Sequence, residues 1–214
     1  MLWDDYAATW SGLHGGFDPR RANVLVRGWV RIAYGAGSWL ARHRIGPMAV
    51  TTAGLLVCAA VPVSVWLLDR PGIFLAAVLV LVAALADGLD GAVAVLTGKT
   101  SRLGYVYDSV ADRLGELAWL AAFWLAGAPG WLVVTAGAAS WLQEYARARA
   151  TAAGMSEIGV VTVAERPTRV LTAIFGLLAA FAFAPLITAA TAVWLALAVI
   201  AGAQLTIAIR RALR

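Results

Sequence analysis

The chain has 214 residues, of which 62% are hydrophobic and 14% are charged, and its mean hydropathy is +0.80. This composition excludes an ordinary soluble domain and is typical of a single membrane-embedded one. The net charge of +5 suits anionic headgroups better than nucleic acid, so no nucleic-acid partner is expected. Cys58 is the only cysteine, which excludes an intramolecular disulfide.

Residues 1–45 are interpreted as a cytoplasmic N-terminal segment. The first twenty are polar and contain glycine, which predicts an irregular start. Residues 21–44 combine apolar and basic side chains, which predicts an amphipathic helix lying on the membrane surface. A helix packed on the rest of the protein is the alternative. The cations of this segment are Arg20, Arg21, Arg27, Arg31, Arg42 and Arg44.

Residues 46–214 predict a domain of six transmembrane helices, since no β-hairpin or barrel pattern appears in their sequence. The expected spans cover residues 46–68, 72–96, 103–125 and 130–145. Two more crossings fit within the uncharged residues 170–209, with Pro185 at the turn between them. Pro62 predicts a kink in the first span. The expected fold class is therefore an all-α integral membrane protein with an N-terminal interfacial helix.

The positive charges predict an orientation for these spans. Of the 17 lysines and arginines, all except Arg70 and the intramembrane Arg113 fall on one side of the topology. Basic residues favour the cytoplasmic side. We therefore expect a multi-pass protein of the cell membrane, with both termini in the cytoplasm.

Four aspartates interrupt the second and third spans: Asp87, Asp90, Asp108 and Asp112. The first two share one helical face, and the last two share another. Carboxylates at membrane depth are costly, and an all-oxygen set without His or Cys favours Mg²⁺ or Mn²⁺. A pair of such ions typically serves phosphoryl transfer. Ion pairs with nearby cations, and an ion-coupled transporter, are alternatives that these residues leave open.

The aspartates belong to a longer pattern, Asp87-x-x-Asp90-Gly91-x-x-Ala94, nine further residues, and Gly104-x-x-x-Asp108-x-x-x-Asp112. It resembles the signature of the CDP-alcohol phosphotransferase family of membrane enzymes. The resemblance implies that the four aspartates bind two divalent ions, which hold the diphosphate of a CDP-linked lipid such as CDP-diacylglycerol. It implies that Asp112 is the base that deprotonates the acceptor alcohol as CMP is released. It also implies membrane lipids and a second copy of the chain, in a homodimer, as partners.

The resemblance extends to the nucleotide site. It implies that Gly91, Ala94 and Gly104 leave room for the nucleotide beside Asp87 and Asp108, and that Thr51 approaches the cytosine. The family usually has arginine directly after the motif alanine, where this chain has Val95. Either Lys99 or Arg102 replaces that cation, or donor binding is altered. A silent homologue that binds the CDP-linked lipid without turnover also remains open.

Two basic segments, residues 144–149 and 165–169, resemble segments of actinobacterial phosphatidylinositol-phosphate synthases. The resemblance implies that Arg147 and Arg169, with Arg166 beside them, hold the phosphate of the acceptor. Inositol phosphate is the preferred acceptor, with glycerol 3-phosphate or another polar alcohol as the alternative. Basic residues in a cytoplasmic loop also fit the orientation rule without any ligand.

Further residues near these segments bear on the acceptor and on the local packing. Glu144 stands where those synthases have serine, and Arg147 stands where they have lysine, which leaves the acceptor open. Arg113 and Glu116 follow Asp112 within about one helical turn. We expect them to form a local supporting ion pair.

Overall fold

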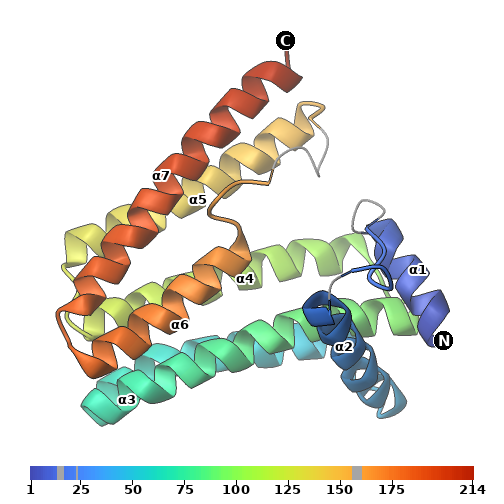
Figure 1. The fold of residues 1–214 in the computed structure, drawn as a ribbon, viewed down its shortest axis with the longest axis horizontal. Helices are drawn as coiled ribbons and strands as arrows, with labels where there is room; N and C mark the ends of the chain where they lie inside the picture. The colour runs from blue at the N-terminus through green and yellow to red at the C-terminus, as the bar shows by residue number, and fades with distance from the viewer. Residues whose placement is uncertain (14–16, 23, 156–160) are drawn as a thin grey trace. The chain divides into compact units, whose positions relative to one another are not determined.

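The computed structural model describes residues 1–13, 17–22, 24–155 and 161–214 (Figure 1). Residues 14–16 of the predicted irregular start and residue 23 of the predicted surface helix lie outside this part. The described residues contain seven α-helices and no strand, which confirms the all-helical prediction. The helices are α1 (Trp3–Leu13), α2 (Val24–Arg42), α3 (Pro47–Thr97), α4 (Arg102–Leu125), α5 (Gly130–Ala152), α6 (Arg166–Ala182) and α7 (Leu186–Ala212).

The chain is organised in two compact units, and each unit draws on separate parts of the sequence. Unit 1 comprises Met1–Leu56 and Val82–Asp112, and unit 2 comprises Val57–Leu81 and Arg113–Arg214. Helix α3 therefore contributes both its ends to unit 1 and its middle to unit 2. All four motif aspartates fall in unit 1, whereas the basic residues expected to bind the acceptor fall in unit 2.

The first helix corrects one expectation. Residues Trp3–Leu13 are helical, so the predicted irregular start is wrong for them. The physical reason is burial: Tyr6 packs in an apolar cluster with Val30 and Ala33 of α2 and with Ala92 and Val95 of α3. The sequence pattern does not predict this helix, because its buried face is short and polar residues surround it.

Helix α2 coincides with most of the predicted surface helix. Val30 and Ala33 are buried in the apolar cluster of unit 1, so the alternative of a packed helix holds for this face. Trp29, Ile32 and Trp39 remain exposed. The helix thus has one packed face and further apolar side chains outside it.

Helix α3 has 51 residues, whereas one membrane crossing needs about 20. Its helical geometry is broken at Asp69, where φ is 49° and ψ is −126°. The two halves correspond to the predicted segments 46–68 and 72–96. The departure from helical dihedrals lies at Asp69, and the kink at Pro62 stays a prediction. The break lies two residues before Pro71, which cannot donate a backbone hydrogen bond.

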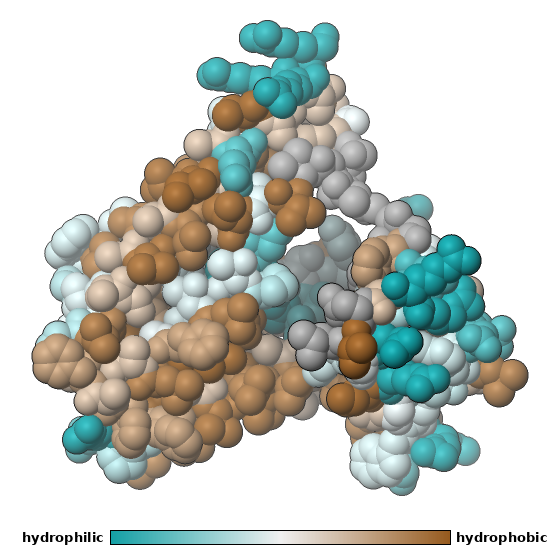
Figure 2. All heavy atoms as spheres, in the orientation of Figure 1, coloured by the Kyte–Doolittle hydropathy of each residue, from teal (hydrophilic) through white to brown (hydrophobic). Residues whose placement is uncertain are grey.

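By length and composition, two of the described helices qualify as membrane-crossing, α3 and α7. Helix α6 has 17 residues, and α4 carries four charged side chains in its middle, which lowers its hydropathy. In unit 2, α7 packs along α5 and α6 (Figure 1). Figure 2 shows apolar atoms along α7 and hydrophilic atoms at its C-terminal end, where Arg210, Arg211 and Arg214 lie. This distribution suits a helix whose basic end leaves an apolar medium.

The close approach at the α3 break gives a stability prediction. A Cβ added to Gly72 would overlap the Ser64 carbonyl oxygen and lie 3.0 Å from Val65 Cα. Because these are backbone atoms, Gly72→Ala should destabilise the protein by about 1–3 kcal/mol or more. Gly202→Ala is the matched control, since a Cβ on this helical glycine meets nothing within 4 Å. Thermal unfolding in detergent should show a lower midpoint for Gly72→Ala only; equal midpoints would contradict the prediction.

Candidate functional site

The structure gathers three of the four motif aspartates. Asp87 and Asp90 come from the second half of α3, and Asp108 comes from α4. One carboxylate oxygen from each residue lies within 4.8 Å of the other two. Asp90 is buried at 6% exposure, and the other two are half-buried. Like charges this close repel one another unless a cation lies between them, and hard oxygen ligands suit Mg²⁺ or Mn²⁺. We call these three residues the carboxylate group.

Asp112 lies on the same face of α4 as Asp108, one turn further along, and is half-buried. Within the described part of the chain, it is not a member of the carboxylate group. Its place on that face leaves it in reach of a ligand bound beside Asp108.

Thr51 contacts the carboxylate group directly. Its hydroxyl lies 2.6 Å from Asp90 Oδ2 and 3.1 Å from the Pro47 carbonyl oxygen. A hydroxyl donates one proton at a time, and the charged, closer acceptor makes the stronger bond. Thr51 therefore donates to Asp90 and fixes the orientation of its carboxylate. The sequence interpretation placed Thr51 at the nucleotide and did not foresee this contact.

Two further polar contacts of unit 1 were missed at the sequence level. The hydroxyls of Thr52 and Tyr107 are 2.8 Å apart and link the start of α3 to α4, one residue before Asp108. Ser101 Oγ accepts a hydrogen bond from the Gly104 backbone N–H at 3.0 Å, which caps the first turn of α4. The serine just before a predicted helix is a signal that could have identified this cap.

The small residues of the motif differ in their surroundings. A Cβ on Gly91 would meet nothing within 4 Å, so the space beside it is open. A Cβ on Gly104 would lie 3.0 Å from Ser101 Oγ, so that glycine permits the capping contact. Ala94 is half-buried on α3.

Val95 occupies the position where a cation was expected, and the structure gives a reason for its apolar character. Its side chain is 6% exposed and belongs to the apolar cluster around Tyr6 and Val30. Lys99 and Arg102, the suggested substitutes, are exposed on either side of the α3–α4 turn. Residue 95 thus serves packing between α3 and the N-terminal helices.

Unit 2 contains a second polar site, which we call the arginine cluster: Arg113, Arg147 and Arg169 with Glu116, Glu144 and Glu165. The predicted pair is confirmed, with Arg113 Nη2 3.0 Å from Glu116 Oε1. Arg169 Nε lies 3.1 Å from the same oxygen. These two contacts are ion pairs by distance, although their directions are not those of hydrogen bonds. Glu116 is 1% exposed, so its charge is balanced inside the protein.

The remaining contacts of the cluster engage the residues expected at the acceptor. Arg169 Nη2 donates to Glu144 Oε1 at 2.6 Å, and Arg147 Nη2 donates to Glu165 Oε1 at 2.7 Å. Glu165 also accepts hydrogen bonds from the Thr162 backbone N–H and hydroxyl. The sequence interpretation assigned the arginines to a ligand and missed these carboxylate partners, although the spacing of Glu144 and Arg147 was a signal. Arg166 is half-buried at the start of α6.

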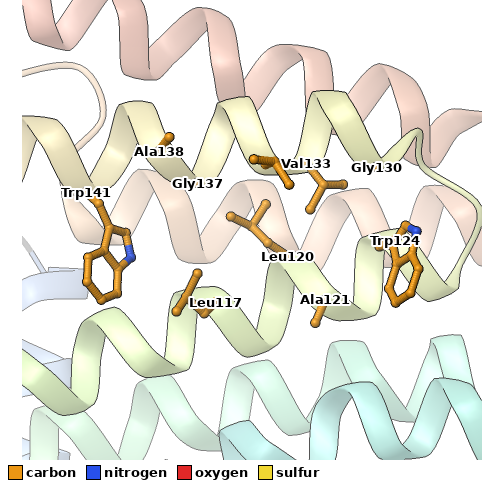
Figure 3. A pocket seen from close by; sticks show the side chains of 10 residues that line it. Leu117, Leu120, Ala121, Trp124, Gly130, Val133, Gly137, Ala138 and Trp141 are labelled. Carbon is orange, nitrogen blue, oxygen red and sulfur yellow. The ribbon is translucent and has the colours of Figure 1, made fainter.

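A large cavity of unit 2 has a different character. It measures about 790 Å³ and lies between α4 and α5 (Figure 3). Its lining consists of Leu117, Leu120, Ala121, Trp124, Gly130, Val133, Val134, Gly137, Ala138 and Trp141. These side chains offer no charge, so the cavity cannot hold a diphosphate. It suits apolar contacts.

Comparisons with known proteins agree with this geometry. Residues 45–206 match the family model of the CDP-alcohol phosphatidyltransferases. The archaetidylinositol phosphate synthase of Pyrococcus horikoshii is 33% identical over 136 residues, which cover 63% of this chain and 70% of that protein. The phosphatidylinositol phosphate synthase of Mycolicibacterium smegmatis is 36% identical over 63% of this chain and 62% of its own length.

Two solved structures of Mycobacterium tuberculosis phosphatidylinositol phosphate synthase have the same fold. The structure with CDP-DAG bound has a TM-score of 0.71 and 26% identity, and covers 84% of this chain and 94% of that one. The complex with manganese and citrate has a TM-score of 0.70 and 25% identity, with coverage of 83% and 88%.

The family match, taken with the apolar helical fold and the carboxylate group, identifies a metal-dependent transferase of membrane lipid synthesis. The chain belongs to the CDP-alcohol phosphatidyltransferase family. Family membership confirms the predicted reaction class, transfer of a substituted phosphate from a CDP-linked donor to an alcohol. The manganese complex of the related structure and the carboxylate group confirm the predicted cofactor class, Mg²⁺ or Mn²⁺.

The Thr51–Asp90 hydrogen bond gives a prediction about cation binding. Thr51→Val keeps the side-chain shape but removes the donor, so Asp90 loses its fixed orientation. Loss of such an outer contact should weaken Mn²⁺ binding roughly tenfold. Titration of the purified protein with Mn²⁺, followed by electron paramagnetic resonance, measures this affinity. Thr206→Val is the control, because the described contact of the Thr206 hydroxyl is to the Gly202 carbonyl of its own helix; equal affinities in both variants would refute the role of Thr51.

Residue 95 gives a second prediction. Val95→Arg places a guanidinium in the apolar cluster of unit 1, where an unbalanced buried charge costs roughly 3–5 kcal/mol. We expect a lower thermal midpoint and no gain in CMP release. Met48→Arg, at an exposed position of α3, should leave the midpoint unchanged. A stable Val95→Arg protein with raised activity would show instead that residue 95 faces the donor.

Proposed function

We propose that this protein transfers the phosphatidyl group of CDP-diacylglycerol to inositol phosphate and releases CMP. The observation that carries the proposal is the carboxylate group, formed by residues of the family signature. The names of the related synthases support the acceptor, since they make inositol phosphate lipids. Glycerol 3-phosphate is the alternative acceptor, because it presents the same phosphate beside a hydroxyl.

In this proposal, Asp87, Asp90, Asp108 and Asp112 hold two Mg²⁺ or Mn²⁺ ions. Such ions, when bound, neutralise a diphosphate and stabilise the departing CMP. The convergence of three carboxylates supports this set, since a divalent ion balances their mutual repulsion. Thr51 assists by holding Asp90, and residues 47–51 thereby act on the donor site.

Asp112 is the proposed base. It accepts the proton of the acceptor hydroxyl while the acceptor oxygen bonds to the phosphorus that carries the diacylglycerol. The bond between that phosphorus and the bridging oxygen breaks, and CMP takes the electron pair. A base must reach its proton within hydrogen-bond distance. Its half-buried position on α4, one turn after Asp108, supports this assignment.

The nucleotide is proposed to lie against Gly91, Ala94 and Gly104, with Asp87, Asp108 and Thr51 beside it. The open space at Gly91 supports this placement. Residue 95 is a valine buried in an apolar cluster, so it supplies no positive charge to the diphosphate of the donor. Cations for its diphosphate come from the bound ions, with Lys99 and Arg102 as further candidates.

The acceptor phosphate is proposed to bind Arg147 and Arg169, with Arg166 beside them. Guanidinium groups present a planar fork of donors that matches phosphate oxygens. Their convergence from α5 and α6 in unit 2 supports the proposal.

The proposed membrane arrangement follows the charge distribution. Residues 46–214 form a six-span catalytic domain, and residues 1–45 form an N-terminal segment whose α2 lies at the membrane surface. The protein is a multi-pass protein of the cell membrane with both termini and the active site in the cytoplasm. It works as a homodimer among membrane lipids. The kinked α3, the apolar α7 and the exposed apolar side chains of α2 support this arrangement.

The reaction gives a direct test. Purified protein with CDP-diacylglycerol, Mn²⁺ and inositol phosphate should release CMP, and chelation of the metal should stop the release. Asp112→Asn should reduce the rate by about 10²–10⁴-fold, because the acceptor hydroxyl loses its base. Asp69→Asn is the matched control and should keep wild-type activity, since Asp69 lies outside the site.

An acceptor panel completes this test with glycerol 3-phosphate and unphosphorylated inositol. Release of CMP with glycerol 3-phosphate alone would assign the alternative acceptor. Metal-independent activity, or full activity in Asp112→Asn, would contradict the proposed mechanism. Absence of CMP release with every acceptor would contradict the proposed function as a whole.

A further inference from the structure

Glu144 lies among three guanidinium groups of the arginine cluster. Its Oε1 lies 2.6 Å from Arg169 Nη2 and 3.2 Å from Arg113 Nη1, and its Oε2 lies 4.0 Å from Arg147 Nε. The three guanidiniums come from α4, α5 and α6. Two carboxylate oxygens therefore sit among donors from three helices, as two oxygens of a bound oxyanion would.

The other two glutamates of the cluster are held differently. Glu116 is almost completely buried between Arg113 and Arg169. Glu165 is fixed by the Thr162 backbone as well as by Arg147. Glu144, with 26% of its side chain exposed, is held in the described contacts by arginines. It is thus the partly exposed carboxylate of this cluster whose described contacts include no backbone group.

Arg169 offers a donor that Glu144 does not satisfy. Its side chain is 3% exposed and engages Glu116 through Nε and Glu144 through Nη2. Its Nη1 is buried and has no hydrogen-bond partner among the described residues. Buried donors in proteins are normally satisfied. This one points to a ligand with more acceptor oxygens than a carboxylate has.

The charges of the cluster also favour a ligand with more acceptor oxygens than a carboxylate. The three positive charges of the arginines and the three negative charges of the glutamates cancel when Glu144 contacts the arginines. When Glu144 turns away, one positive charge and several guanidinium donors are left uncompensated. A phosphate monoester brings up to two negative charges and three acceptor oxygens, so it binds this arrangement better than a carboxylate does.

We propose that Glu144 is an internal competitor of the acceptor phosphate, bound to Arg169 and its neighbours until that phosphate displaces it. The inference rests on the proposed function and deepens it. Glu144 becomes a specificity-determining residue, because every phosphorylated acceptor must displace its carboxylate. Its presence weakens binding of the phosphate and so sets the concentration of acceptor that the enzyme requires.

Binding of inorganic phosphate tests this role without turnover. Wild type and Glu144→Gln are titrated with phosphate by calorimetry in the presence of EDTA, so that no divalent ion contributes a phosphate site. Gln keeps the size of the side chain but removes its charge. We expect Glu144→Gln to bind phosphate at least tenfold more tightly than wild type. In the assay for CMP, its KM for inositol phosphate should fall by a similar factor, with little change in the KM for CDP-diacylglycerol.

Two variants complete the experiment. Asp18→Asn removes one negative charge from an exposed pair with Arg20 and should leave phosphate affinity at the wild-type value. Glu144→Asp keeps the charge on a side chain one methylene shorter, so it should compete less well and give an intermediate affinity. This second variant decides the question if Glu144→Gln does not fold.

Unchanged or weaker phosphate binding in folded Glu144→Gln or Glu144→Asp would overturn the inference, because Glu144 would then only position the arginines. The outcome is separate from that of the proposed function. CMP release from inositol phosphate with unchanged phosphate affinity in the variants defeats this inference alone. Tighter phosphate binding without CMP release from any acceptor defeats the proposed function and leaves the role of Glu144 standing.

Discussion

The repulsion among Asp87, Asp90 and Asp108 is the constraint on which the rest of unit 1 depends. Three carboxylates with oxygens within 4.8 Å of one another, in an otherwise apolar sequence, are unfavourable without a cation. The surrounding structure holds them in place nonetheless. Thr51 fixes Asp90, and the Thr52–Tyr107 contact links the two helices that carry the group. A divalent ion bound among these oxygens would relieve the repulsion.

Unit 1 gathers negative charge, whereas unit 2 buries positive charge. Arg169 is almost fully buried, and a lone cation there would be costly. Glu116 and Glu144 provide this balance through their contacts with Arg169. If a phosphorylated ligand displaces Glu144 as proposed, the network that stabilises the fold also selects among ligands.

Val95 shows how a family pattern and local packing can diverge. The family usually has arginine directly after the motif alanine. Here Tyr6 of the N-terminal helix α1 packs in one apolar cluster with Val95 of α3. An arginine at this position would enter the apolar cluster. The N-terminal segment therefore contributes to the core beside the signature helix, and it explains an apolar residue that the motif alone leaves unexplained.

The sequence by itself determined the helical class, the two halves of α3 and the identity of the signature aspartates, because apolar run length and motif spacing are local properties. It also indicated the pair of Arg113 and Glu116, which are close on one helix. Only the tertiary structure decided that Asp112 stands outside the carboxylate group, that Thr51 donates to Asp90, and that Glu144 receives Arg169 from another helix. These contacts join residues 25 to 39 positions apart or depend on side-chain direction. Helical periodicity specifies a face, whereas the partner on that face is specified by packing.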